Sequence, residues 1–387
     1  MKTLISTLAF ALAAAPLASC NAAPAQPASG KTTAQAGFAI EEYGKFDEPW
    51  AMAFAPGTGV LFVTERGGTL KFVDTASKRA GTVTGLPKVD YGGQGGLGDI
   101  AFLPNEAFAT LAKRTIYLTW VEAGTGDTRG AVVGRGTLIC EEADACRIDA
   151  MKVIWRQNPK VAGRGHYSHR LSFSPDGKYL FVASGDRQKF TPAQDLAGNL
   201  GKIVRLTPDG APAPGNPFAA RGGVAAETWT LGHRNILGLQ WDSRGRLWDL
   251  EHGPAGGDEL NLVEPGKNYG WPVVSNGDHY DGKPIPRHVT RPDLAAPAIS
   301  WNPVIAPGDF VFYSGKAFPA WQGQALIAGM AYPGIVRVAI DGTSAREVER
   351  IDLGNRIREI EQGPDGAVWI AEDGKSGGRL RKLVAKR

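Results

Sequence analysis

The residues best suited to chemistry gather between Leu231 and Pro272. The polar members of this stretch are His233, Arg234, Asn235, Glu251, His252, Asp258 and Glu259. Arginine offers a planar fork of donors that matches carboxylates. A step such as Gly253-Pro254 can turn backbone carbonyls toward a ligand, because glycine permits unusual dihedrals and proline fixes its own. The stretch is therefore suited to holding a ligand that carries carboxylates.

Two apolar, alternating runs lie among these polar groups, at residues 236–241 and 247–250. The turn Asp242-Ser243-Arg244-Gly245 joins them, and the alternation together with this turn predicts a β-hairpin. The polar groups then lie at strand ends and in loops, where a rigid sheet can present them to a ligand.

Further candidates lie before or after other apolar strands. Gln94 stands in the glycine-rich segment 92–98, which lets the backbone run close to a ligand. Nothing there indicates a strand followed by a helix, so a phosphate cradle is not expected, and the alternative is a plain turn. Arg356 and Arg358 are two residues apart, which places both on one face of a strand. The alternative is a solvated edge pair.

Histidine is the natural base for taking a hydroxyl proton near neutral pH, and His166 and His169 both precede an apolar strand. Asp186 follows the next strand, where a carboxylate behind an imidazole would fix its tautomer. The alternatives are ordinary loop histidines and a turn aspartate.

From residue 37 on, no helix longer than two turns is expected. One unit recurs instead: an apolar strand, a turn, an apolar strand, a gap and an alternating strand. Its six copies begin near residues 50, 99, 171, 236, 310 and 357. Six successive meanders predict an all-β, six-bladed β-propeller and are hard to fit into a two-sheet sandwich. The binding site is expected at one mouth of the central channel.

The composition is that of an ordinary globular protein, with 43% hydrophobic and 21% charged residues among 387. The net charge of +4 comes without basic clusters, so no nucleic-acid partner is expected.

Residues 1–19 have the pattern of a signal peptide, and the apolar run Leu4 to Leu17 is too short to span a bilayer. The ending Leu17-Ala18-Ser19-Cys20 resembles a lipoprotein signal, with lipid added to Cys20; the alternative is a plain secretory signal. Residues 20–36 are expected to form a flexible tether, and residues 37–387 the propeller. We therefore expect export to the periplasmic face, with membrane attachment only through the lipid.

Cys140 and Cys146 are the remaining cysteines. Exported chains meet oxidising conditions, which favours a disulfide that closes a small loop over two free thiols. A metal site would need more ligands than this segment supplies.

The segments LGHRN, EHGP, GDELN and KNYGWP resemble the soluble aldose sugar dehydrogenases that use pyrroloquinoline quinone (PQQ), the glucose/sorbosone dehydrogenase-like family. The resemblance covers about residues 40–385. It implies cofactor binding by Gln94, Arg234, Asn235, Arg356 and Arg358. It also implies a calcium ion held by the backbone carbonyls of Gly253 and Pro254. Asp258 and Glu259 are candidates for a second, structural calcium, or are salt-bridged surface acids.

The resemblance also implies a mechanism. His166, supported by Asp186, takes the proton from the anomeric hydroxyl of an aldose, and hydride passes to the quinone, which calcium polarises. Arg234 stabilises the developing oxyanion, a lactone leaves, and an external acceptor takes the electrons.

Some positions depart from the family pattern. Ala331 stands where a lysine is common, His169 where glycine is usual, and a hydroxyl residue often found near Val304 is missing. Two rival functions follow. One is a propeller that has lost PQQ and binds carbohydrate or protein. The other is a metal-dependent lactonase, which would need several side-chain carboxylate or Asn ligands converging on one calcium.

Overall fold

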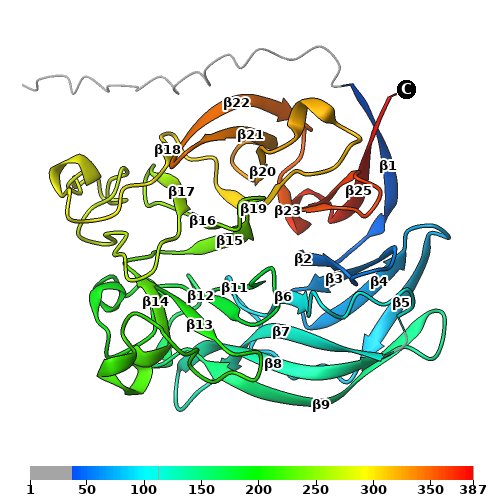
Figure 1. The fold of residues 1–387 in the computed structure, drawn as a ribbon, viewed down its shortest axis with the longest axis horizontal. Coiled ribbons are helices and arrows are strands. Elements are labelled where there is room, and N and C mark those ends of the chain that lie inside the picture. The colour runs from blue at the N-terminus through cyan, green and yellow to red at the C-terminus, as the bar shows by residue number, and fades with distance from the viewer. Residues whose placement is uncertain (1–36, 112, 387) are drawn as a thin grey trace, which may run out of the picture. The chain divides into compact units, whose positions relative to one another are not determined.

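The computed structural model describes residues 37–111 and 113–386 (Figure 1). The predicted signal peptide, the predicted tether and Cys20 lie outside these residues, so those expectations stay predictions.

Within the described residues, the strands form five hydrogen-bonded sheets, and the largest joins two four-stranded antiparallel units through the parallel pairing of β5 with β9. Counted as antiparallel units there are six, which fits the predicted six blades. The first three units are β2 (Pro49–Phe54), β3 (Val60–Glu65), β4 (Thr69–Asp74) and β5 (Arg79–Thr84); β6 (Leu97–Phe102), β7 (Lys113–Ala123), β8 (Thr128–Ile139) and β9 (Ala145–Arg156), with the short β10 (Val161–Ala162) beside β8; and β11 (Ser168–Phe173), β12 (Leu180–Ser184), β13 (Lys202–Leu206) and β14 (Thr228–Leu231).

The other three units are β15 (Ile236–Trp241), β16 (Leu247–Glu251), β17 (Asp258–Leu262) and β18 (Ile299–Trp301); β19 (Pro307–Phe312), β20 (Ala325–Gly329), β21 (Gly334–Asp341) and β22 (Ser344–Asp352); and β23 (Ile357–Gln362), β24 (Val368–Glu372) and β25 (Arg379–Ala385) together with β1 (Phe38–Lys45). The strands β15 and β16 are joined by the predicted turn and pair antiparallel, as predicted.

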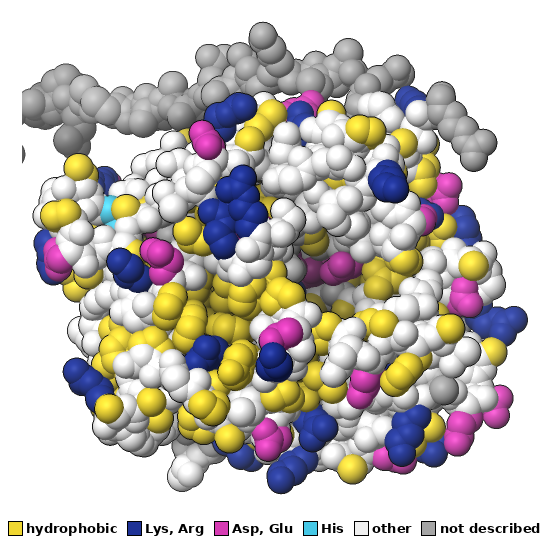
Figure 2. All heavy atoms as spheres, in the orientation of Figure 1, with side chains coloured by type: hydrophobic (Ala, Val, Ile, Leu, Met, Phe, Trp, Pro, Cys, Tyr) yellow, Lys and Arg dark blue, Asp and Glu magenta, His cyan; other side chains and the backbone are white. Residues whose placement is uncertain are grey.

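The units close into a ring. The first strands β2, β6, β11, β15, β19 and β23 each contact the next, and β23 contacts β2 (Figure 1). The N-terminal strand β1 pairs antiparallel with β25, so one blade is built from both ends of the described chain. Closure of this kind protects the strand edges of an all-β protein. Figure 2 shows the ring hollowed near its centre, with acidic side chains inside the hollow.

Packing between neighbouring blades follows from the apolar faces of the inner strands. Between the first two blades, the rings of Phe72 and Phe102 lie 5.4 and 5.3 Å from that of Phe62, and all three are buried. Burying one such side chain contributes about 1.5–3 kcal/mol. Similar clusters lie between the other blades, which holds the first strands at fixed positions around the channel.

Arg170 of β11 ties the ring together from inside. Its side chain is 3% exposed and contacts each of the other five first strands. Its partners are the Trp50 ring at 4.2 Å, Asp99 Oδ1 at 3.4 Å, the Leu237 carbonyl at 2.6 Å, the Gly308 carbonyl at 3.0 Å and Glu359 Oε2 at 2.7 Å. A single buried guanidinium therefore links its own strand to the other five first strands.

The described helices are short 3₁₀ turns, which agrees with the expectation of no long helix. They are η1 (Thr191–Gln194), η2 (Ala219–Arg221), η3 (Gly223–Glu227), η4 (His288–Thr290), η5 (Pro319–Trp321) and η6 (Gly374–Ser376). In the part of the chain that the structure describes, no helix has the length and apolar character needed to cross a membrane.

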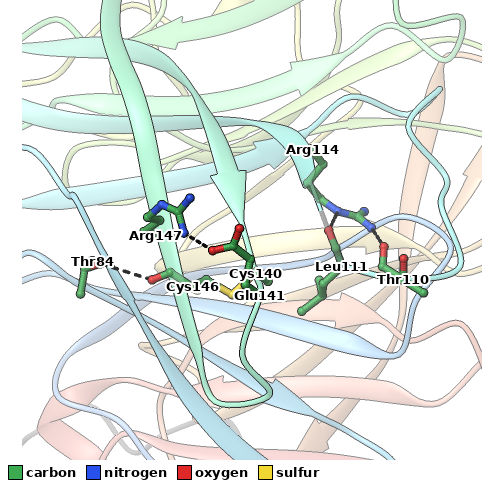
Figure 3. Close-up of a disulfide and its surroundings, with 8 residues drawn as sticks. All are labelled: Thr84, Thr110, Leu111, Arg114, Cys140, Glu141, Cys146 and Arg147. Carbon is green, nitrogen blue, oxygen red and sulfur yellow. Dashed lines mark hydrogen bonds and ion pairs between the residues drawn. A yellow bond between two sulfur atoms is a disulfide. The ribbon is translucent and has the colours of Figure 1, made fainter.

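A disulfide joins Cys140 to Cys146 of β9, the pairing expected from the sequence, and closes the loop between β8 and β9 (Figure 3). Glu141 in this loop also forms an ion pair with Arg147 of β9. Thr84 of β5 donates to the Cys146 carbonyl at 3.4 Å, and β5 pairs in parallel with β9. The closed loop therefore contacts the first blade as well as its own.

Candidate active site

A cavity of about 340 Å³ opens at the end of the ring where the first strands begin. Its lining comes from two kinds of position. Gln94, Asn235 and Arg356 lie just before a first strand, whereas Arg66 and Asp373 lie directly after the second strand of a blade. The predicted location, at the channel mouth formed by the loops before the first strands, is therefore where the cavity is found.

His166 and Asp186 form an oriented pair; neither is part of the cavity lining, but Tyr167 and Ser168, which directly follow His166, line it. His166 Nδ1 lies 2.7 Å from Asp186 Oδ1, and the other carboxylate oxygen accepts Trp271 Nε1–H at 2.7 Å. The carboxylate holds the proton of the imidazole on Nδ1, which leaves the Nε2 lone pair to accept a proton. No hydrogen bond to Nε2 is found among the described residues. The pair thus has the arrangement of a general base and its supporting acid.

The local backbone holds this histidine in place. His166 has φ 50°, and its N–H donates to Gln94 Oε1 at 2.7 Å. Gly185 packs so closely that a Cβ there would lie 2.1 Å from the His166 carbonyl oxygen. Burial lowers the pKa of His166 below its ordinary value, although Asp186 opposes this effect. The imidazole is therefore neutral at pH 7, as a base must be.

His169 has a different environment. Its ring lies 4.8 Å from that of Trp50, its Nδ1 is buried with no partner among the described residues, and burial lowers its pKa to about 3. A Cβ at Gly98 would lie 2.1 Å from its Cε1 atom. His169 lines the cavity, but no carboxylate orients it. The geometry favours His166 as the base and a packing role for His169.

Arg234 and Asn235 lie at the start of β15, next to this pair. The Arg234 side chain donates to the His252 carbonyl at 3.1 Å and to Tyr280 Oη at 3.3 Å, and its Nε is buried without a partner among the described residues. Its carbonyl accepts the Asp186 N–H at 2.8 Å, which joins it to the base. Asn235 is buried and lines the cavity.

Arg356, just before β23, and Arg358, within β23, both line the cavity but are not equivalent. Arg356 is engaged by Asp373, with Nε and Nη2 at 2.8 and 2.7 Å from Oδ2. Arg358 has only a long contact of 3.7 Å to the same oxygen. Burial lowers the pKa of Arg358 to about 10, so it stays charged at neutral pH. Arg358 is the more available of the two for a carboxylate ligand.

Sequence reasoning missed two further cations that line the cavity, Arg66 and Lys375. Arg66 pairs with Glu48 at 2.7 Å, whereas Lys375 makes no ion pair within the described residues. Arg66 could have been predicted from its position in the sequence. It follows β3, the second strand of its blade, just as Asp186 follows β12, the second strand of another blade. Ala331, which stands where the family commonly has a lysine, is exposed and does not line the cavity. The cavity does have a lysine, Lys375, which comes from η6.

The candidate calcium ligands Gly253 and Pro254 lie in an adjoining cleft that Arg234 and Glu259 also line. Among the described residues, neither backbone carbonyl accepts a hydrogen bond, which leaves both oxygens available to a cation. His252 lines both the cleft and the main cavity, so the two are neighbours.

Asp258 and Glu259 are not surface acids, and that interpretation was wrong. Both are buried because β17 lies inside its blade, with exposures of 1% and 6%. The Asp258 carboxylate accepts the N–H groups of Gly253, Ile305 and Ala306 at 2.7–2.9 Å, which makes it a structural clamp. Glu259 lies 3.8 Å from His288 Nδ1, and burial raises its pKa well above the ordinary value.

A buried polar cluster holds the backbone of Arg234 in place. Glu251 Oε2 accepts the Arg234 N–H at 2.7 Å, and Oε1 lies 3.1 Å from His233 Nδ1. Asn261 donates to Glu251 and to Asp249 at 3.3 and 3.2 Å. These groups are almost fully buried, so their role is to fix the start of β15 rather than to meet a ligand.

Comparison with known proteins gives consistent results. The family model described as Glucose / Sorbosone dehydrogenase matches residues 46–382. The aldose sugar dehydrogenase YliI of Escherichia coli (strain K12) is 36% identical over 345 residues, which is 87% of this chain and 90% of that protein.

Solved structures are similar as well. The soluble aldose sugar dehydrogenase of Escherichia coli in its apo-form superposes with a TM-score of 0.81 at 34% identity, over 90% of this chain and 99% of that one. The PQQ-bound aldose sugar dehydrogenase of Streptomyces coelicolor has a TM-score of 0.68 at 24% identity, over 90% and 98%, and shares the fold.

Proposed function

The chain belongs to the glucose/sorbosone dehydrogenase family, and we propose that it oxidises aldose sugars at the anomeric carbon to lactones, with PQQ and calcium bound at the cation-lined mouth of the channel. The observation that supports this most strongly is the juxtaposition of an oriented base with uncommitted cations. His166 and Asp186 lie 2.7 Å apart beside a cavity that Arg358 and Lys375 line.

The residues present fit the proposed cofactors. PQQ carries three carboxylates, and guanidinium groups bind carboxylates through paired, charge-assisted hydrogen bonds. Arg358 and Lys375 meet this need, and the unpartnered Nε of Arg234 offers one more donor. The carbonyls of Gly253 and Pro254 are hard oxygen ligands of the kind calcium prefers. When bound, PQQ supplies the hydride acceptor and calcium the Lewis acid that polarises it.

The protein's own residues would then act as follows. His166 Nε2 takes the proton of the anomeric hydroxyl while Asp186 keeps the other ring nitrogen protonated. The imidazolium that forms is stabilised by the adjacent carboxylate. Arg234 donates to the oxygen as it becomes anionic. The lactone leaves, and an external acceptor takes the electrons.

The rival functions are less well supported. A lactonase would need several side-chain carboxylates free to bind one calcium. The acids that line the main cavity, Glu48 and Asp373, are instead paired with Arg66 and Arg356. A propeller used only for binding would have no need of an imidazole oriented by a buried carboxylate. That reading would gain support if PQQ failed to bind.

The direct test is to add PQQ and calcium to the apo-protein and to follow dye reduction with a panel of aldoses. We expect activity that requires both additions, with release of a lactone. Saturable PQQ binding without oxidation of any aldose would show that the substrate class is wrong.

We further propose that the chain is exported and attached to the membrane by a lipid on Cys20. An acyl chain contributes about 0.8 kcal/mol of membrane affinity per buried CH₂. Cys20→Ser should therefore release the protein from membranes. Equal membrane association of variant and parent would remove this proposal.

A further inference from the structure

A second cavity, of about 390 Å³, lies at the end of the ring where the first strands finish, opposite the candidate active site. Phe54, Phe173 and Trp241, the last residues of β2, β11 and β15, are part of its lining. Among the described lining residues, one cation, Arg170, faces four acids: Asp99, Asp309, Glu359 and Glu361. The proposed oxidation of sugars uses none of these acids.

Three of the four acids gather around the Arg170 guanidinium. Glu359 Oε2 lies 2.7 Å from Nη2, and Asp99 Oδ1 and Asp309 Oδ2 lie 3.4 and 3.6 Å from Nη1. A guanidinium carries a single positive charge, so it balances only one of three ionised carboxylates. The cluster therefore has an excess of negative charge that no other described residue of the lining offsets.

Glu361 extends this cluster toward solvent. It lies two residues beyond Glu359 in β23, so both side chains point to the same face of the strand. Glu361 is partly exposed, whereas Glu359 is 1% exposed. Burial raises the pKa of Glu361 to about 8, and the charge of Asp309 adds to this rise. A full set of ionised acids here is therefore costly without a further positive charge.

The Asp309 carboxylate is the group that points to a ligand. The residue is 3% exposed, and its Oδ1 is buried without a hydrogen-bond partner among the described residues. Native proteins normally supply a buried carboxylate oxygen with a donor, a water or an ion, because leaving it unpaired costs free energy. Asp309 lines the cavity, so a cation there would be within its reach.

The donor chemistry of the lining selects the kind of cation. Besides the carboxylates, it includes the amide of Gln240 and the hydroxyl of Ser172, and among its described residues neither histidine nor cysteine. Donors that are all oxygen favour a hard divalent cation over zinc or copper. Calcium takes about six to eight oxygens in a flexible geometry, waters included, and this volume has room for a hydrated ion.

We propose that this cavity binds a calcium ion through Asp309 of β19 and through Glu359 and Glu361 of β23. These strands belong to neighbouring blades, and β23 also contacts β2 of the first blade. The ion thus links two blades next to the point where the ring closes, so its role is structural. It is separate from the calcium proposed at Gly253 and Pro254, and it does not depend on sugar oxidation.

The binding test is a calcium titration of EDTA-treated apo-protein, without PQQ, by isothermal titration calorimetry. We expect the parent to bind with a Kd of about 1 mM or lower, the range of extracellular calcium modules. Glu361→Gln and Asp309→Asn keep the side-chain shape and remove one charge. Each should weaken this binding at least about tenfold, because even groups that only support a ligand change metal affinity by about 10- to 100-fold.

The matched control is Asp293→Asn, which removes a carboxylate from the surface pair with Arg291 and should bind calcium as the parent does. Gly253 and Pro254 are unchanged in all variants, so a binding event lost in Glu361→Gln and Asp309→Asn belongs to this cavity. Absence of calcium binding to the parent, or identical titrations of parent, Glu361→Gln and Asp309→Asn, would overturn the proposal.

Thermal unfolding separates a ligand role from a packing role. In EDTA, Glu361→Gln removes a repelling carboxylate, so its Tm should equal or exceed that of the parent. In excess calcium the parent should gain Tm, because an ion that binds only the folded state stabilises it, and the variant should gain less. A Tm that the variant lowers equally with and without calcium would show that Glu361 only packs. Equal gains in parent and variant would show that the acids share protons instead, and either result rejects the site.

Discussion

The two ends of the channel are built from the same six strands and have opposite charge. At the end where the first strands begin, a cavity of about 340 Å³ is lined by Arg66, Arg356, Arg358 and Lys375 against two carboxylates. At the end where those strands finish, a cavity of about 390 Å³ is lined by Asp99, Asp309, Glu359 and Glu361 against Arg170. We call these the cationic mouth and the acidic mouth.

The comparison shows that size does not decide which end takes a ligand. The two mouths are similar in size, but burial raises the pKa of Glu361 to about 8 and that of Asp99 to about 6. These carboxyls are costly to ionise and repel an anion when they do ionise. Arg358 keeps its charge at pH 7, and Gln94, which accepts the His166 N–H, lines the cationic mouth and not the acidic one. A carboxylate-rich cofactor is therefore expected at one end alone.

The largest effect should come from removing Arg170, the residue that links the six first strands. Arg170→Met leaves Glu359, Asp99 and Asp309 without their buried counter-charge, which typically costs about 3–5 kcal/mol. We expect a large loss in the free energy of unfolding. Burial raises the pKa values of Asp99 and Asp309 and Arg170 lowers them, so removing Arg170 raises them further. The loss should be largest at high pH, where the acids are ionised, and should shrink as pH falls and they protonate.

Chemical denaturation at several pH values measures this effect. Arg291 pairs with Asp293 on the surface and serves as the matched control, because Arg291→Met should change stability by no more than about 1 kcal/mol. Equal stability of Arg170→Met and parent at pH 8 would show that Arg170 does not hold the ring together.

The next effect concerns the base. His166→Ala should lower kcat by about a hundredfold or more, the usual weight of a general base, and should leave PQQ bound. His169→Ala should instead lower the Tm, because it leaves a cavity beside Trp50, with a smaller effect on kcat. Steady-state dye reduction measures kcat of both variants, and PQQ titration measures whether each variant still binds the cofactor. If only His169→Ala abolished turnover, the assignment of the base would be wrong.

A smaller effect should appear in the pH profile. Because the pKa of His166 is below its ordinary value of about 6.5, kcat/KM should be level near neutral pH and fall only at lower pH, as the imidazole takes up a proton. Asp186 raises this pKa, so Asp186→Asn should move the acidic limb to lower pH while also reducing the rate. A limb that moved to higher pH would contradict the proposed pairing.

Much of this arrangement could be predicted from the sequence. Alternating apolar runs and turns identify the inner strands of every blade, because those strands are buried on both faces. The outer strands were missed, since β5 and β22 are half-exposed and mix charged with apolar residues. The contribution of β1 to the last blade depends on ring closure, which no local pattern reports.

The site was predicted only in part. Motifs located His166, Asp186 and Arg234, but the inequality of Arg356 and Arg358 depends on Asp373, a partner from another strand. The burial of Asp258 and Glu259 depends on the neighbouring strands of their blade. The acidic mouth had no sequence signal either, because its four carboxylates come from three separate strands.

The central claim is that the cationic mouth binds PQQ, and a PQQ titration by tryptophan quenching at fixed calcium tests it most directly. The titration compares the parent with two variants. Arg358→Ala removes a charged side chain from the cationic mouth, and Glu361→Ala removes one from the acidic mouth. We expect saturable binding to the parent at micromolar PQQ. Loss of one charge-assisted contact should weaken binding to Arg358→Ala about ten- to a hundredfold, and Glu361→Ala should bind as the parent does. No binding to the parent, or equal affinities for parent and Arg358→Ala, would contradict the account.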